Sequence, residues 1–318
     1  MEKARKPFVA VVGPTASGKT ALSIALAREF DAEIISADSM QIYDGMDVAT
    51  AKPTTREMQG IPHHLLGFVD ISQKFSVAQY LDCARECIED ILSRDKKIIV
   101  AGGTGLYINS LVDNIQFEDE AENQLRSELS AQAKSFGGAY MLQKLKGLDP
   151  EYAALLHEND ITRIIRGIEI NMIFGHTMSE HKRLSRENKS PYDVLMLGIT
   201  FRDRQKLYDR IDRRVEIMLE NGLEAEARHF FDRFDSSKTA VQAIGYKELF
   251  PYIEGKISLD EAVDNLKRAT RNYAKRQLTW FRKDERINWL YADELEKNEL
   301  IDMAKNLCVS FYSNSGKS

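Results

Sequence analysis

The chain has 318 residues, of which 43% are hydrophobic and 29% are charged, and its formal net charge is −5. These values are typical of a soluble globular enzyme that is large enough to bury a full core. No apolar run approaches the roughly 18 residues that a membrane helix needs, and residues 1–6 are too short and polar for a signal peptide. The three cysteines suit a reducing compartment better than a disulfide framework. We therefore expect a cytoplasmic protein without membrane contact.

Residues 13–20, Gly-Pro-Thr-Ala-Ser-Gly-Lys-Thr, follow an apolar run at 8–12 and precede a segment of helix-forming composition at 21–27. A strand, a glycine-rich turn and a helix in this order predict a phosphate-binding loop, because backbone N–H groups and the start of a helix can hold an anion. Lys19 is expected to bind the outer phosphate oxygens, and Thr20 to be a hydroxyl ligand of Mg²⁺. The alternative is a glycine-rich connector with a chance Lys-Thr pair. The residues expected to hold a diphosphate or triphosphate are Gly13, Pro14, Thr15, Ala16, Ser17, Gly18, Lys19 and Thr20.

Further apolar runs predict strands at 32–36, 97–101, 194–200 and 287–290, and apolar residues at helical spacing predict helices at 75–94, 202–231 and 259–283. This alternation predicts an α/β fold with a doubly wound parallel sheet, similar to that of P-loop NTPases. In such sheets the ligand binds beyond the carboxyl ends of the strands. The phosphate loop, Asp38 and Thr104 follow three of these strands, so we expect them at one edge of the sheet.

Residues 115–189 differ in character from the rest of the chain. They are charged and helical in pattern, with breaks at Gly137-Gly138 and Asp149-Pro150 and no convincing strand. The segment is longer than an ordinary connection between strands. We interpret it as a helical insertion domain, which leaves residues 1–114 and 190–318 as the catalytic core.

The end of the strand predicted at 97–101 bears on the phosphate chemistry. A nucleotide hydrolase needs a second acid after a later strand to hold Mg²⁺ and order the attacking water. This strand is followed instead by Gly-Gly-Thr-Gly at 102–105, without a carboxylate. Asp38, one strand earlier, suits a group that faces an acceptor held beside the phosphates. Its alternative role is to cap a helix that follows it, through Ser39.

The helix predicted at 259–283 is strongly basic and also carries Tyr273, Trp280 and Phe281. It has no acid between Asp264 and Asp284, so pairing with acids one turn away cannot explain the charge. We therefore favour contact with a phosphate backbone over a solvated basic face. A second basic stretch lies within the insertion, at 163–189.

Taken together, several stretches resemble tRNA dimethylallyltransferases, in chain order from residue 8 to about residue 290. They are the phosphate loop, Asp-Ser-Met-Gln-Ile-Tyr at 38–43, Gly-Met-Asp-Val-Ala-Thr-Ala-Lys-Pro at 45–53, Pro-His-His at 62–64, Gly-Gly-Thr-Gly-Leu-Tyr at 102–107, Ala-Ile-Gly-Tyr-Lys-Glu at 243–248 and Lys-Arg-Gln-Leu-Thr-Trp-Phe-Arg at 275–282. The resemblance implies transfer of the dimethylallyl group from dimethylallyl diphosphate to N6 of adenosine 37, beside the anticodon, in tRNAs that read codons beginning with U. Diphosphate is then released.

The resemblance also implies roles for individual residues. Asp38 would be the general base, with Lys19 and Thr104 as further catalytic residues, and Mg²⁺ would bind at Thr20. The insertion would grip the anticodon stem-loop, and the enzyme would act as a monomer. The residues implied in tRNA binding are Asp38, Ser39, Met40, Gln41, Thr104, Thr162, Arg163, Arg166, Arg271, Lys275, Arg276 and Gln277.

Some positions stay open at this point. Gln242 lies where some family members carry Arg, so it receives no phosphate role. A loop role is favoured over metal binding for His63 and His64, because adjacent histidines point in different directions. Tyr43 and Phe75 either line a prenyl pocket or belong to the core. The alternative functions are an ATP-dependent small-molecule kinase and a non-catalytic RNA-binding module, and occupation of the phosphate loop by ATP is undecided.

Overall fold

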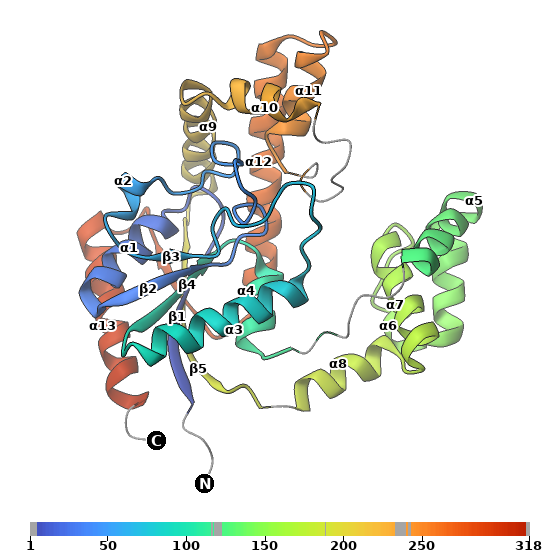
Figure 1. The fold of residues 1–318 in the computed structure, drawn as a ribbon, viewed down its shortest axis with the longest axis horizontal. Helices are drawn as coiled ribbons and strands as arrows, with labels where there is room; N and C mark the ends of the chain where they lie inside the picture. Colours follow the sequence, from blue (N-terminus) through green and yellow to red (C-terminus); the bar gives the residue numbers. More distant parts are fainter. Residues whose placement is uncertain are drawn as a thin grey trace. The chain divides into compact units, whose positions relative to one another are not determined.

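The computed structural model describes residues 5–115, 117, 123–187, 189–232, 240 and 243–315. The chain divides into two compact units (Figure 1). Unit 1 comprises Met1–Val112 and Ser190–Ser318, and Unit 2 comprises Asp113–Lys189. Gln242 lies outside the described residues.

Unit 1 is built on a parallel sheet of six strands. The strands are β1 (Lys6–Val12), β2 (Ala32–Ser36), β3 (His63–His64), β4 (Lys97–Gly102), β5 (Tyr192–Thr200) and β6 (Ile287–Tyr291). Their order in the sheet is β3-β2-β4-β1-β5-β6, and every neighbouring pair is parallel. This confirms the predicted fold class.

Helices cover both faces of this sheet (Figure 1), as expected for a doubly wound sheet. On one face α1 (Lys19–Phe30) and α13 (Lys297–Ser315) pack against each other and against Val9 and Val11 of β1. On the other face lie α3 (Val77–Ser93) and α4 (Gly105–Val112). The helix α13 was not expected from the sequence, although its buried residues Leu300, Ala304 and Cys308 recur every four residues.

A group of helices in Unit 1 lies beyond the carboxyl ends of the strands (Figure 1). It contains α9 (Arg204–Glu220), α10 (Leu223–Phe231), α11 (Tyr246–Ile253) and α12 (Leu259–Phe281). The single helix predicted at 202–231 is two helices, because the chain breaks at Gly222, whose φ of 92° favours glycine. These helices share a hydrophobic core with the loop after β2, through residues such as Ile42 and Met46.

The loop after β2 differs in two respects from the prediction. It contains a short helix, α2 (Thr55–Met58), and the two histidines form the edge strand β3. His64 Nε2 lies 2.7 Å from a Glu33 carboxylate oxygen, and a hydrogen bond from Arg94 lowers the pKa of that carboxyl to about 2. The loop role that we favoured for the two histidines is therefore wrong.

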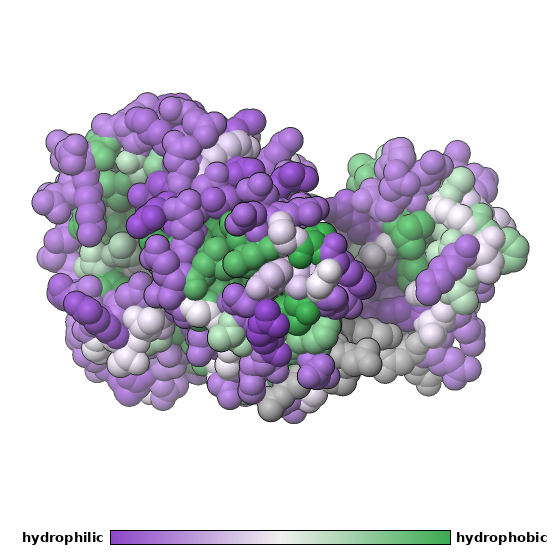
Figure 2. Space-filling model, turned by 90° about the horizontal axis from the view of Figure 1, so that it is seen from above, coloured by the Kyte–Doolittle hydropathy of each residue, from purple (hydrophilic) through white to green (hydrophobic). Residues whose placement is uncertain are grey.

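Tyr43 and Phe75, the two candidates for a prenyl pocket, belong to the core. Tyr43 is fully buried and Phe75 packs against the same hydrophobic cluster. Within the described residues, no helix is long and apolar enough to cross a membrane. Most of the face drawn in Figure 2 is hydrophilic, and the hydrophobic residues on it form separate patches.

Within the described residues of Unit 2, all regular secondary structure is helical. Its helices are α5 (Asn123–Leu148), α6 (Pro150–Ala153), α7 (Ile161–Phe174) and α8 (Met178–Glu187). The predicted breaks coincide with a kink at Gly137, where φ is 81°, and with Asp149, which caps α6. The helices enclose a core of their own, which includes Leu145 and Ile168.

Candidate active site

The phosphate loop joins β1 to α1 and closely approaches the neighbouring strand β5. A Cβ atom on Gly13 would lie 2.4 Å from the carbonyl oxygen of Ile199, so only glycine fits this position. Lys19 is the first residue of α1, and its Nζ donates to the carbonyl oxygen of Pro14 at 2.7 Å. The buried Ser17 hydroxyl has no hydrogen-bond partner among the described residues. An unsatisfied buried hydroxyl in a loop that leads into a helix fits a bound diphosphate.

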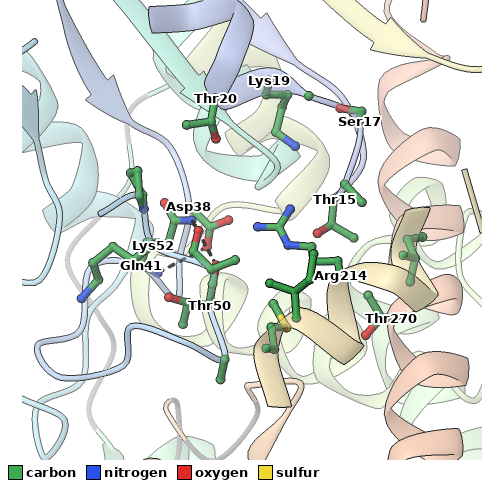
Figure 3. A pocket seen from close by; sticks show the side chains of 18 of the residues that line it. Thr15, Ser17, Lys19, Thr20, Asp38, Gln41, Thr50, Lys52, Arg214 and Thr270 are labelled. Carbon is green, nitrogen blue, oxygen red and sulfur yellow. Dashed lines mark hydrogen bonds between the residues drawn. The ribbon is translucent and has the colours of Figure 1, made fainter. Parts of the chain in front are cut away.

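Three charged side chains are directed towards the same part of the cavity above this loop (Figure 3): Lys19, Asp38 and Arg214. Burial, and then the positive charge of Arg214, lower the pKa of Lys19 to about 7, and the negative charge of Asp38 opposes this shift. Burial also lowers the pKa of Arg214, again against the effect of Asp38. Two partly buried cations in one cavity favour an anionic ligand, because a negative charge between them offsets the cost of removing them from water.

Arg210 and Arg214 lie one helical turn apart on α9, and the sequence analysis did not identify either of them. Arg210 Nε donates to the carbonyl oxygen of Ala16 in the phosphate loop at 2.9 Å. Both arginines line the cavity. Their positions on one face of a helix were visible in the sequence, but no local signal connected this helix with the phosphate loop.

Asp38 and Thr104 follow β2 and β4, as predicted, and hold the turn between residues 38 and 41. Asp38 Oδ1 accepts hydrogen bonds from the backbone N–H groups of Met40 at 3.0 Å and of Gln41 at 3.4 Å. Thr104 Oγ1 accepts from the Ser39 N–H at 3.0 Å. One carboxylate oxygen of Asp38 thus caps a turn, and this contact orients a side chain that also lines the cavity.

Gln277 on α12 connects the phosphate loop with the turn after β4. Its Oε1 accepts from the Thr15 N–H at 2.8 Å, and its Nε2 donates to the Gly103 carbonyl oxygen at 3.0 Å. A Cβ atom on Gly103 would lie 2.2 Å from that Nε2, so the contact requires a glycine. The Gln277 amide, which was expected to bind tRNA, is buried and bonded to these two backbone groups.

The cavity above the sheet has a volume of about 1530 Å³ and combines a polar and an apolar wall. The polar wall contains residues 15–20, Asp38 and the two arginines of α9. The apolar wall comes from the loop after β2, from α9 and α12, and from the turn before α11. Its side chains include Met40, Val48, Ala49, Val215, Met218 and Leu266. Such a cavity can hold a ligand with an anionic end and a short hydrocarbon end.

The basic face of α12 is partly neutralised by acids of α9. Both Oδ atoms of Asp212 accept from Arg271, at 2.5 and 2.7 Å, and Lys267 pairs with Glu216 at 3.1 Å. These partners could not be found from the spacing within one helix, because they lie on another helix. Lys275 and Arg276 are exposed, and Arg276 also lines the cavity.

The remaining residues that were expected to bind tRNA lie in Unit 2, on α7. Thr162 and Arg163 are exposed, and Arg163 lies 3.8 Å from Asp160. Arg166 lies 3.5 Å from Glu169, a buried carboxylate that also accepts two hydrogen bonds from Arg126.

The described residues contain no group of three or more His, Cys, Asp or Glu side chains that could hold a metal ion. Thr20 supplies an exposed hydroxyl at the start of α1, and the Asp38 carboxylate lines the same cavity. This sparse donor set fits Mg²⁺, which usually keeps several waters and takes its other ligands from substrate phosphates.

The parallel sheet, the phosphate loop at the carboxyl end of its central strand and the two-walled cavity together define an enzyme of the P-loop α/β class. Residues 41–284 match the family model described as IPP transferase. The chain belongs to the IPP transferase family.

Curated relatives agree with this assignment. The chain is 46% identical over 303 residues to the tRNA dimethylallyltransferase of Thermoanaerobacter sp. (strain X514). The aligned region covers 94% of this chain and 96% of the relative. It is 48% identical over 299 residues to the enzyme of the same name from Acetivibrio thermocellus, and the aligned region covers 93% of this chain and 95% of the relative.

Solved structures agree as well. The full-length tRNA isopentenylpyrophosphate transferase of Bacillus halodurans is 41% identical, with a TM-score of 0.74 and coverage of 98% of this chain and 99% of that chain. A eukaryotic dimethylallyltransferase, described as acting on tRNA, is 29% identical, with a TM-score of 0.84 and coverage of 97% and 80%. This chain is thus an enzyme of the tRNA dimethylallyltransferase type.

Proposed function

We propose that the chain transfers the dimethylallyl group of dimethylallyl diphosphate to N6 of adenosine 37 in tRNAs that read codons beginning with U, and releases diphosphate. The observation that carries this proposal is the single cavity in which an anion cradle, a carboxylate and an apolar wall meet. A prenyl diphosphate matches both walls, and the carboxylate faces the space that remains for an acceptor.

The cradle would stabilise the leaving group. As the bond between the allylic carbon and oxygen breaks, negative charge develops on the diphosphate. Lys19, Arg214 and the N–H groups of the phosphate loop supply fixed positive charge and dipoles for it, so little reorganisation is needed during the reaction. Arg210, which is bonded to the Ala16 carbonyl oxygen, would keep the loop in place.

Mg²⁺ would be held by the Thr20 hydroxyl together with diphosphate oxygens and water, and it would add positive charge at the leaving group. The described residues provide few other ligands for it. The binding of Mg²⁺ is therefore expected to depend on the donor.

Asp38 would act as the general base. The N6 lone pair of adenine is delocalised into the ring, so the attack on the allylic carbon becomes easier when a proton is removed as the new bond forms. Asp38 Oδ1 is oriented by two backbone N–H groups in a turn that Thr104 holds through Ser39. A base in this position contributes typically about 10²- to 10⁴-fold to the rate.

The tRNA would bind to basic residues outside the donor cradle. The target base has to leave its stack to reach a buried site, which costs a few kcal/mol that phosphate contacts offset. The exposed Lys275 and Arg276 of α12 are candidates in Unit 1. The helical Unit 2, with Thr162 and Arg163 exposed on α7, is the candidate for gripping the anticodon stem-loop.

The test is to incubate the purified protein with Mg²⁺, labelled dimethylallyl diphosphate and unmodified tRNA. We expect label in the RNA, one diphosphate released per group transferred, and no transfer to a tRNA with guanosine at position 37. Consumption of ATP without alkylation of RNA would overturn the proposal in favour of a kinase, and RNA binding without either reaction would favour a binding module.

A further inference from the structure

The carboxylate of Glu226 is partly buried, and the proposed reaction leaves its contacts unexplained. Glu226 lies on α10, and its two oxygens accept hydrogen bonds from three consecutive backbone N–H groups. Oε2 accepts from Asp47 at 3.0 Å and from Val48 at 2.7 Å, and Oε1 accepts from Ala49 at 2.9 Å. The hydroxyl of Tyr246 donates to Oε1 at 2.7 Å.

The segment that Glu226 holds is part of the wall of the donor cavity. Val48, Ala49 and Ala51 line this cavity together with the phosphate loop. The segment is also fixed at its other end, because Gln41 Nε2 donates to the carbonyl oxygens of Thr50 and Ala51 at 3.1 and 3.2 Å. Glu226 therefore holds the backbone of residues 47–49, and Gln41 holds the backbone of the two residues that follow them.

The turn before α11, which also lines the cavity, packs closely against the segment. A Cβ atom on Gly245 would lie 3.0 Å from the Ala49 Cβ, so the turn before α11 presses closely on this residue. Hydrogen bonds from N–H groups to a charged acceptor are roughly twice as strong as neutral ones. Because the wall is already ordered before the ligand binds, binding does not include the entropic cost of ordering the wall.

We propose that Glu226 is a positioning residue for the donor: it holds residues 47–51 as the apolar wall against which the five-carbon chain packs. The contacts of Glu226 are with Asp47, Val48, Ala49 and Tyr246, which lie outside the phosphate loop, so we expect the loop to bind the diphosphate independently of them. The inference rests on the proposed function, because it assigns the apolar wall to a prenyl group.

The variant Glu226→Gln tests this inference. It replaces one acceptor oxygen by an NH₂ group, so at least one of the N–H groups that face it loses its partner. Glu224→Gln is the matched control, because Glu224 lies two residues away on α10 and accepts from Arg228 and Tyr252 instead of the wall. The dissociation constants of dimethylallyl diphosphate and of inorganic diphosphate are measured for each full-length protein by calorimetry with Mg²⁺.

We expect Glu226→Gln to weaken the binding of dimethylallyl diphosphate about tenfold, which corresponds to ~1.4 kcal/mol, and to leave that of inorganic diphosphate unchanged. In the transfer assay the KM for the donor rises by a similar factor, and the KM for tRNA stays the same. Glu224→Gln behaves like the wild type. Tyr246→Phe removes one hydrogen bond to Glu226, so it weakens the binding of dimethylallyl diphosphate alone by a smaller factor. This variant tests the inference if Glu226→Gln does not fold.

Equal weakening of both ligands, or no weakening of either, would overturn the inference. This result is distinct from a failure of the proposed function. If the wild type binds inorganic diphosphate but gains nothing from the dimethylallyl group and alkylates no RNA, the proposed function fails. If the wild type is active and Glu226→Gln binds the donor normally, only the role of Glu226 fails.

Discussion

Replacing Gln277 by leucine should destabilise Unit 1 strongly, because the side chain of Gln277 satisfies two backbone groups at once. Leucine has a similar size but no polar atoms, so the Thr15 N–H and the Gly103 carbonyl oxygen would lose their bonds of 2.8 and 3.0 Å. Leaving a buried backbone group without a partner costs roughly 1–3 kcal/mol. Two such groups give an expected loss of about 3 kcal/mol in the free energy of unfolding.

Urea denaturation followed by tryptophan fluorescence measures this loss. Both tryptophans of the chain, Trp280 and Trp289, lie in Unit 1, so the signal reports the unfolding of that unit. The control is Gln205→Leu, in which an exposed glutamine loses a bond to Asp209. We expect that variant to change the free energy by no more than about 0.5 kcal/mol. If Gln277→Leu lowers the free energy of unfolding by no more than the control does, Gln277 does not stabilise the connection between the phosphate loop and α12.

Three further predictions concern the binding of the donor, the metal and the RNA. Because the pKa of Lys19 is lowered to about 7, the unfolded chain holds more protons than the folded chain above that pH, so the stability of the ligand-free protein should rise with pH from about 7 towards 10. In Lys19→Met, the urea midpoint of unfolding should rise less between these pH values. If the pH profiles of the variant and the wild type are parallel, the pKa of Lys19 is not lowered. Thr20→Val should raise the Mg²⁺ concentration needed for half-maximal transfer, whereas an unaltered titration would remove Thr20 from the metal site. Arg271→Glu should weaken tRNA binding and lower the slope of log K against log salt by about 1, while Asp212→Asn, which releases Arg271 from its ion pair, should strengthen binding. Unchanged slopes in both variants would limit Arg271 to packing between α9 and α12.

The parts of the fold and site that could be predicted depend on signals that are local in sequence. The phosphate loop combines a strand, a glycine-rich turn and a helix within about 20 residues. Asp38 and Thr104 each follow a buried strand directly, and the parallel order of the strands places them at the same edge. The part of the polar wall that residues 15–20 and Asp38 form therefore followed from the sequence.

The parts that could not be predicted depend on contacts between distant segments. Arg214 and Glu226 lie on helices with many charged residues, a pattern that is typical of a solvent-exposed face. Arg214 lines the cavity and Glu226 bonds to the loop after β2 only because α9 and α10 pack over that loop. The pairing of Arg271 with Asp212 was missed for the same reason. The strand β3 has only two residues, too few for a periodic pattern, and it exists because β2 offers an edge.

In the proposed reaction Asp38 removes the proton from N6 while the cradle holds the leaving diphosphate. The most direct test is the single-turnover rate of Asp38→Asn with tRNA and dimethylallyl diphosphate both saturating and Mg²⁺ present. We expect a rate about 10²- to 10⁴-fold below that of the wild type, with the dissociation constant for tRNA almost unchanged. A rate within a few-fold of the wild type, together with a weakened affinity for tRNA, would contradict it and make Asp38 a binding residue.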